Sequence, residues 1–138
     1  MESSELHRIK LILNPTAGHG RGRKELEHIL GTIRSYNIRV DLAITEFHRH
    51  AVQLAEEVDY SEYDALVVAG GDGTVYEAMN GLMTLPEEER KPLGIIPIGT
   101  GNAGAWDTAR VRKIDEAVAV IARGNTRRVD VGSFLMDH

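Results

Sequence analysis

The stretch VVAGGDGTVYEAMNGL, residues 67–82, connects a continuous apolar run to a helical pattern through a short glycine-rich loop. The apolar run begins at Ala65 and ends at Ala69, and its length and β-branched residues are typical of a buried strand. After the loop, apolar residues recur at helical spacing, at Val75, Ala78, Met79 and Leu82. A strand that leads through a glycine loop into a helix is the repeating unit of parallel α/β sheets.

The same alternation of strand and helix patterns extends over the rest of the chain. The expected strands are Ile9–Leu13, Val40–Ile44, Ala65–Ala69, Leu93–Ile98 and a last one containing Val129 and Val131. The expected helices lie around Leu26–Ile33, Ala51–Val58, Val75–Leu82 and Ile114–Ile121. Strands that are apolar along their whole length are buried on both faces. The sequence therefore predicts a three-layer α/β fold, with helices on both sides of a mostly parallel, Rossmann-like sheet.

Composition sets limits on the kind of protein this is. The chain of 138 residues is long enough for one domain, and 42% of its residues are hydrophobic. Its net charge of −5 argues against a nucleic-acid binder, because contacts with phosphate backbones need an excess of Lys and Arg. It has no cysteine, which excludes disulfides and thiolate metal sites. No apolar run of membrane-spanning length and no signal peptide is evident, so a cytoplasmic protein is expected.

Glycine-rich or polar loops follow four of the expected strands. They read NPTAGHGRG (residues 14–22), TEFHRH (45–50), GGDGT (70–74) and GTGNAG (99–104). In open parallel sheets, ligands bind beyond the carboxyl ends of the strands, where these loops meet. Glycines let backbone N–H groups approach a ligand, and a following helix offers its positive N-terminus to phosphate. Any one of these loops is equally well explained as a tight turn, but the three that contain glycine together favour a nucleotide.

Two common phosphate-binding motifs do not account for these loops. The P-loop pattern GxxxxGK[ST] is absent. A literal GxGxxG occurs at Gly99, Gly101 and Gly104, but it follows the fourth strand rather than the first. It also lacks the acidic residue expected roughly twenty residues further on. We interpret this match as fortuitous.

Asp72 is the unusual residue of the third loop, because a carboxylate among phosphates is repelled unless a cation lies between them. Mg²⁺ suits that role, since proteins hold it with one or two carboxylates together with phosphate and water. Glu77 follows about one helical turn later and is a second candidate ligand. The alternative is that Asp72 is a turn-forming or helix-capping aspartate.

The segments NPTAGHGRG, GGDGTVYEAMNGL and LGIIPIGTGN, in this order and spacing, resemble the catalytic domains of diacylglycerol kinases, sphingosine kinases and bacterial lipid kinases. ITEFHRHAVQLAEE (residues 44–57) and RRVDVGSF (127–134) resemble further segments of that family. The resemblance extends from about residue 8 to residue 134. It implies the fold of the N-terminal domain of the NAD kinase and diacylglycerol kinase-like proteins. GGDGT is shared mainly with NAD kinases and phosphofructokinases.

The resemblance implies a kinase that uses Mg²⁺ and transfers the γ-phosphate of ATP to the hydroxyl of a diacylglycerol-like or sphingoid lipid. By position, the implied nucleotide-binding residues are Asn14, Gly18, Thr45, Gly70, Gly71, Asp72, Gly73, Thr74, Glu77, Gly99, Thr100, Gly101 and Asn102, with Asp72 also assigned to Mg²⁺. The family's general base lies in a second, mostly β domain. Residues 1–138 are therefore expected to form the nucleotide-binding half of a longer protein, without a catalytic residue and inactive alone.

Other interpretations remain open at this point. Tyr76 replaces an asparagine that is usual in the family, and Ala103–Trp106 departs from the usual sequence after GTGN. A nucleotide-binding module without catalysis and a NAD kinase-like enzyme are the alternatives. His48 and His50 are two apart but have no evident further metal ligands, and the resemblance makes His50 a structural residue at a helix start. Peripheral membrane contact and a homodimer are further expectations for the complete kinase.

Overall fold

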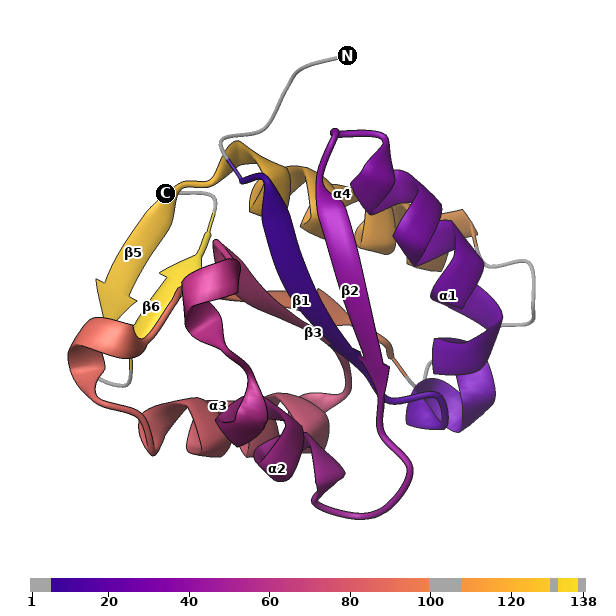
Figure 1. The fold of residues 1–138 in the computed structure, drawn as a ribbon. Coiled ribbons are helices and arrows are strands. Elements are labelled where there is room, and N and C mark those ends of the chain that lie inside the picture. Colours follow the sequence, from indigo (N-terminus) through magenta and orange to yellow (C-terminus); the bar gives the residue numbers. More distant parts are fainter. Residues whose placement is uncertain (1–5, 100–107, 130–131, 137–138) are drawn as a thin grey trace.

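The structure is a computed structural model that describes residues 6–99, 108–129 and 132–136, and it contains one six-stranded sheet between two layers of helices (Figure 1). The elements in chain order are β1 (Arg8–Leu13), α1 (Ala17–Arg34), β2 (Arg39–Ile44), α2 (His50–Glu57), η1 (Tyr60–Glu62), β3 (Ala65–Gly70), α3 (Asp72–Met83), η2 (Glu87–Glu89), β4 (Leu93–Pro97), α4 (Thr108–Arg123), β5 (Thr126–Val129) and β6 (Gly132–Leu135). The predicted three-layer α/β fold with a mostly parallel sheet is confirmed.

The strand order is β2-β1-β3-β4-β6-β5, and every neighbouring pair except β5 with β6 is parallel. Leu11 of β1 lies beside Leu42 of β2 on one side and Val67 of β3 on the other. Because β1 to β4 run in the same direction, their carboxyl ends meet at one edge of the sheet. The loops that the sequence singled out all leave from this edge.

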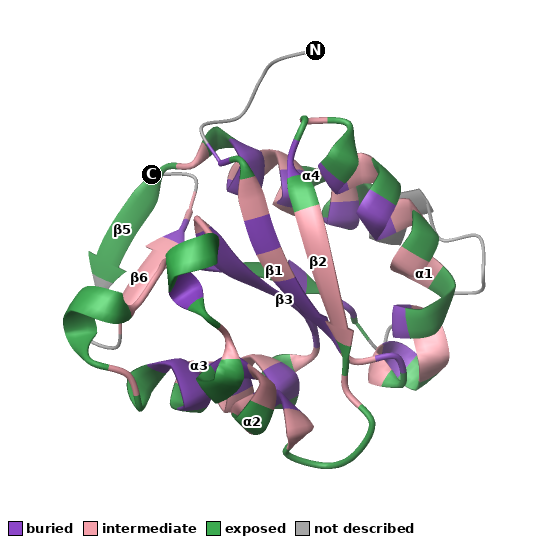
Figure 2. Ribbon diagram, viewed as in Figure 1, coloured by how far each residue is buried: buried purple, intermediate pink, exposed green. Residues whose placement is uncertain are grey.

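Each face of the sheet is covered by two helices, and the core lies between them (Figure 2). One face packs against α1 and α4, with Ile29, Ile33, Ile114, Val118 and Ile121 buried there. The other packs against α2 and α3, with Ala51, Ala55, Ala78 and Leu82 buried. All six residues of β3 are buried, as expected for the central strand of a sheet covered on both sides. In the described part of the chain, no helix has the length and apolar character needed to cross a membrane.

The end of the chain differs from the expectation. The sequence predicted one last strand containing Val129 and Val131, whereas β5 and β6 form an antiparallel hairpin. Only β6 reaches the parallel sheet, where Phe134 lies beside Leu93 of β4. Gly132 opens β6 with a φ of 143°, a conformation that side chains rarely adopt, and this glycine lies where the chain reverses direction. Val131 lies outside the described residues.

Candidate functional site

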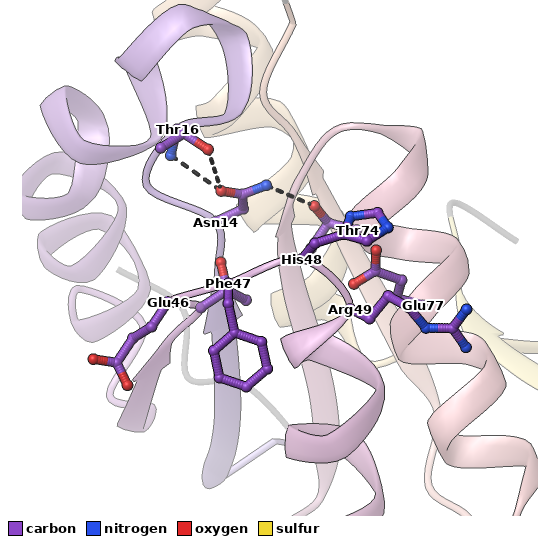
Figure 3. A pocket seen from close by; sticks show the side chains of 9 residues that line it. Asn14, Thr16, Glu46, Phe47, His48, Arg49, Thr74 and Glu77 are labelled. Atoms are coloured by element: carbon purple, nitrogen blue, oxygen red, sulfur yellow. Dashed lines mark hydrogen bonds between the residues drawn. The ribbon is translucent and has the colours of Figure 1, made fainter.

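A pocket of about 320 Å³ lies at the carboxyl edge of the sheet (Figure 3). Its walls come from the loops after β1 and β2 and from the first turns of α3. The lining residues are Asn14, Thr16, Thr45, Glu46, Phe47, His48, Arg49, Thr74 and Glu77. The volume is at the lower end of the range of about 300–1,000 Å³ that is usual for small-molecule pockets.

Asn14 ties two of these walls together. Its backbone N–H donates to the carbonyl of Ala69 over 3.0 Å, and its Nδ2 donates to Thr74 Oγ1, also over 3.0 Å. Its Oδ1 accepts from the backbone N–H of Thr16 at 3.0 Å and from Thr16 Oγ1 at 2.9 Å (Figure 3). A backbone N–H can only donate, so Oδ1 must face Thr16 and Nδ2 must face Thr74. The hydroxyl of Thr74 accepts this bond, and its own proton is left to donate to another group.

The loop after β1 requires glycine for two reasons. Gly18, His19 and Gly20 have left-handed backbone conformations, with φ values of 61°, 59° and 92°. A Cβ atom at position 18 would also lie 2.4 Å from the carbonyl oxygen of Gly99. The backbone of this loop is therefore packed against the end of β4, and Arg21 Nη1 donates to the same carbonyl over 3.3 Å.

The GGDGT segment connects β3 to α3. It is closely packed at Gly70 and open at Gly71 and Gly73. A Cβ at Gly70 would lie 2.8 Å from Cβ of Thr74, so this glycine allows the helix to start close to the strand. A Cβ at Gly71 or Gly73 would meet nothing within 4 Å. Gly71 is the N-cap and no side chain caps α3. The first N–H groups of this helix therefore lack helical partners, and such groups attract anions.

The loop after β2 holds an unusual arrangement of rings. Its start is fixed to β1, because the backbone N–H of Thr45 donates to the carbonyl of Leu13 over 3.0 Å. Arg49 has a left-handed φ of 70°, which is uncommon for a residue with a side chain. The rings of Phe47 and His50 stack with centroids 4.1 Å apart and an interplanar angle of 19°. The backbone N–H of Glu46 donates to His50 Nδ1 over 2.9 Å.

The predicted site residues divide into three groups. Those that line the pocket are Asn14, Thr45, Thr74 and Glu77. Those in the adjoining strand ends, turns and first helical turns, but outside the pocket lining, are Gly18, Gly70, Gly71, Asp72, Gly73 and Gly99. Thr100, Gly101, Asn102 and the Ala103–Trp106 segment lie outside the described residues. Tyr76 is 66% exposed on α3.

The sequence did not assign five of the residues that line the pocket. These are Thr16, Glu46, Phe47, His48 and Arg49. All five lie inside segments that the sequence analysis identified as loops at strand ends. Their position in these loops was therefore the one feature that could have indicated a place in the site. Their side chains gave no signal, because Glu, His and Arg are ordinary surface residues and Phe is ordinarily a core residue. His50 begins α2, as the resemblance implied.

Three carboxylates lie in or beside the pocket, namely Glu46 and Glu77, which line it, and Asp72 at the start of α3. Asp72 is exposed in the first turn of α3, and Glu77 reaches the pocket from the same helix. Among the described residues, no group of three or more His, Asp or Glu side chains is arranged to hold a metal ion alone. This sparse donor set fits Mg²⁺, which proteins commonly hold with one or two carboxylates together with phosphate and water.

Comparison with known proteins gives consistent matches over nearly the whole chain. The family model described as the diacylglycerol kinase catalytic domain matches residues 8–134. The diacylglycerol kinase of Bacillus subtilis strain 168 is 33% identical over 128 residues, which are 92% of this chain. Sphingoid long-chain bases kinase 1 of Arabidopsis thaliana is 34% identical over 129 residues, which are 90% of this chain. The crystal structure of a diacylglycerol kinase from Bacillus anthracis strain Sterne aligns with 96% of this chain, with a TM-score of 0.72 and 30% identity.

These relatives are considerably longer than the chain. The matched region is 42% of the Bacillus subtilis protein and 17% of the Arabidopsis thaliana protein. It covers 50% of the chain in the Bacillus anthracis structure. The similarity therefore concerns one part of each relative.

Proposed function

We propose, from the premise that this chain belongs to the diacylglycerol kinase catalytic domain family, that its pocket binds the triphosphate of ATP during phosphoryl transfer to a lipid hydroxyl. The observation that carries the proposal is the junction of Asn14 with Thr74, which joins two of the glycine loops beside the pocket. Loops of this kind at the carboxyl edge of a parallel sheet are suited to phosphate.

The chain's own residues have separable tasks in this proposal. The unpaired N–H groups at the start of α3, from Asp72 to Thr74, donate to phosphate oxygens, and the open space at Gly71 and Gly73 admits them. The hydroxyls of Thr45 and Thr74, which both line the pocket, donate to the phosphates as well. Asp72 and Glu77 hold Mg²⁺ together with the phosphates. When bound, the ion offsets the charge that develops on the transferred phosphoryl group.

The acceptor half of the reaction is assigned to a further domain. Phosphoryl transfer to an alcohol needs a base on the acceptor hydroxyl, placed in line with the phosphate. We assign that base to a second, mostly β domain, as the family resemblance implies, and the relatives are long enough to contain one. We therefore expect this chain to bind nucleotide and the complete kinase to phosphorylate diacylglycerol or a sphingoid base at a membrane surface.

Calorimetric titration of the chain with Mg-ATP tests nucleotide binding. Thr74→Val removes a pocket hydroxyl and should weaken binding about ten- to hundredfold, since a hydrogen bond to a charged group contributes about 1.5–3 kcal/mol. Thr84→Val is the matched control, because the Thr84 hydroxyl donates to Gly81 at the far end of α3. Equal effects of the two substitutions would contradict the assignment of the pocket. Tighter binding of NAD⁺ than of ATP would favour a NAD kinase-like enzyme instead.

Phosphoryl transfer by the complete kinase is measured separately. Vesicles that contain diacylglycerol or a sphingoid base are incubated with labelled ATP, and label in the lipid is counted. Transfer to one of these lipids is expected from the complete kinase and none from the 138-residue chain. Binding of ATP without transfer by the complete protein would favour a nucleotide-binding module without catalysis.

A further inference from the structure

Phe47 is a large apolar side chain that the fold leaves in solvent at the edge of the pocket. Its side chain is 58% exposed, and it lines the pocket together with polar residues. In Figure 3 its ring points away from the Asn14–Thr16 hydrogen bonds, which lie at the top of the view. An exposed phenylalanine is not explained by core packing, since burying such a side chain contributes about 1.5–3 kcal/mol that this position largely forgoes.

The ring is nevertheless held in place. One face stacks on the imidazole of His50, with centroids 4.1 Å apart. The imidazole is fixed in turn, because its Nδ1 accepts the backbone N–H of Glu46. The turn closes with a hydrogen bond of 3.1 Å from the N–H of His50 to the carbonyl of Phe47. Arg49 adopts a left-handed conformation within this turn, which is unfavourable for a residue with a side chain.

A rigid aromatic ring with one covered and one open face is suited to a planar ligand. Offset stacking of flat rings is favourable, and stacking of nucleobases on aromatic side chains contributes measurably to affinity. The phosphate-binding loops include Asn14 and Thr74, whereas the ring of Phe47 points away from the Asn14–Thr16 hydrogen bonds. A nucleotide lying across the pocket therefore has its phosphates at one end and its base near this ring.

We propose that Phe47 is the surface on which the purine base of the nucleotide stacks, and that it determines how strongly the pocket prefers a nucleotide to a bare polyphosphate. This inference rests on the proposed function. Phe47 acts by direct contact with the ligand, while His50 and the backbone N–H of Glu46 are positioning groups that hold the ring.

The test compares two ligands that differ in the base, namely Mg-ATP and magnesium tripolyphosphate, by calorimetry on the chain. Phe47→Ala should weaken Mg-ATP binding about tenfold and leave tripolyphosphate binding unchanged. Phe47→Leu should give the same result, because leucine packs on His50 but has no aromatic face. Ile44→Ala is the control, since Ile44 is 39% exposed nearby and does not line the pocket. It should change neither affinity.

Phe47→Trp gives a spectroscopic readout. The larger ring should restore or strengthen Mg-ATP binding, and its fluorescence should be quenched by Mg-ATP but not by tripolyphosphate. The wild-type chain, whose only tryptophan is Trp106, provides the background signal. Absence of quenching together with unchanged affinity would contradict stacking.

The outcomes separate this inference from the proposed function. If wild-type chain binds tripolyphosphate as tightly as Mg-ATP, the base makes no contact and the inference fails while the phosphate site stands. If neither ligand binds, the proposed function fails and the inference with it. If Phe47→Ala retains Mg-ATP binding but loses binding to diacylglycerol vesicles, Phe47 is a membrane contact and the inference is overturned.

Discussion

The side-chain amide of Asn14 donates to the hydroxyl of Thr74 over 3.0 Å, across a separation of 60 residues in the chain. Thr74 is a buried polar residue, with 7% of its surface exposed. The hydrogen bond fixes the loop after β1 against the first turn of α3. Two loops that are proposed to share a triphosphate are thereby held together before any ligand arrives.

This hydrogen bond should be measurable by a double-mutant cycle with Asn14→Ala and Thr74→Val. We expect each single substitution to destabilise the fold and the pair to show a coupling of about 0.5–1.5 kcal/mol, the usual contribution of one hydrogen bond. The cycle removes the separate loss of the Thr16 contacts from the comparison. Urea denaturation of the four proteins gives the coupling, and additive effects would mean that the bond does not contribute to stability.

Two glycines of α1 should respond to alanine in opposite directions. Gly18→Ala adds a Cβ at 2.4 Å from the Gly99 carbonyl at a φ of 61°, so we expect a loss of several kcal/mol. Gly31 lies in regular helix with open space around it, and Gly31→Ala should stabilise by about 0.5–1 kcal/mol. Melting temperatures should move by about 4 °C for each kcal/mol.

Gly20 separates backbone strain from close contact in the same loop. Its φ is 92°, but a Cβ there would meet nothing within 4 Å. Gly20→Ala should therefore cost only about 1–2 kcal/mol, the usual penalty for a left-handed residue. Equal losses at positions 18 and 20 would show that contact with Gly99 is unimportant.

Asp72→Asn should separate function from stability. Asp72 is exposed, and no side chain caps α3, so we expect a change in stability below about 1 kcal/mol from the loss of a charge near the helix N-terminus. In the complete kinase, the rate should fall about a hundredfold or more, because the carboxylate positions Mg²⁺. Melting temperature and kcat are measured on one preparation. A destabilised variant with normal turnover would identify Asp72 as a turn residue only.

Asp41 lies on β2, away from the pocket, and should make the stability of the fold depend on pH. The hydroxyl of Tyr63 and then the guanidinium of Arg8 donate to its carboxylate and lower the pKa of Asp41 below the ordinary 3.8. A lowered folded-state pKa contributes stability above the unfolded pKa, and this is lost as pH falls through the folded value. Asp41→Asn should therefore lower the melting temperature at pH 7.

The difference in melting temperature between wild-type protein and Asp41→Asn should become smaller as the pH falls below about 4. Tyr63→Phe, which removes the first of the two donors, should move that narrowing to higher pH. A gap that stays constant from pH 7 to pH 2 would show that the carboxylate is not held in its charged form by these partners.

The periodicity of the sequence was sufficient for the fold as far as α4. Continuous apolar runs such as Ala65–Gly70 are buried in full, so their type and position followed directly. The terminal hairpin was missed because β5 and β6 are only four residues each, too short for alternation to reveal a reversal. The pairing of β6 with β4 depends on tertiary contacts, which the local sequence pattern does not reveal.

The sequence likewise indicated only those site residues that a local pattern marks. The glycines follow from backbone requirements that can be recognised in the sequence, and Thr74 belongs to the same GGDGT segment. The stacking of Phe47 on His50 cannot be recognised in this way, because it depends on the left-handed turn at Arg49. A residue such as Arg gives no signal for that conformation, which glycine or asparagine would have given.

Amide chemical-shift mapping shows whether the pocket between the loops after β1, β2 and β3 receives the nucleotide. Isotope-labelled chain is titrated with Mg-ATP while the backbone N–H signals are followed. We expect the signals of residues 14, 16–18, 45–50 and 70–77 to shift together with one dissociation constant, Pro15 having no N–H. Signals at the amino edge of the sheet, such as those of Arg90 and Lys91, should stay in place. Shifts confined to that opposite edge, or no shift at any Mg-ATP concentration, would show that the nucleotide does not bind in this pocket.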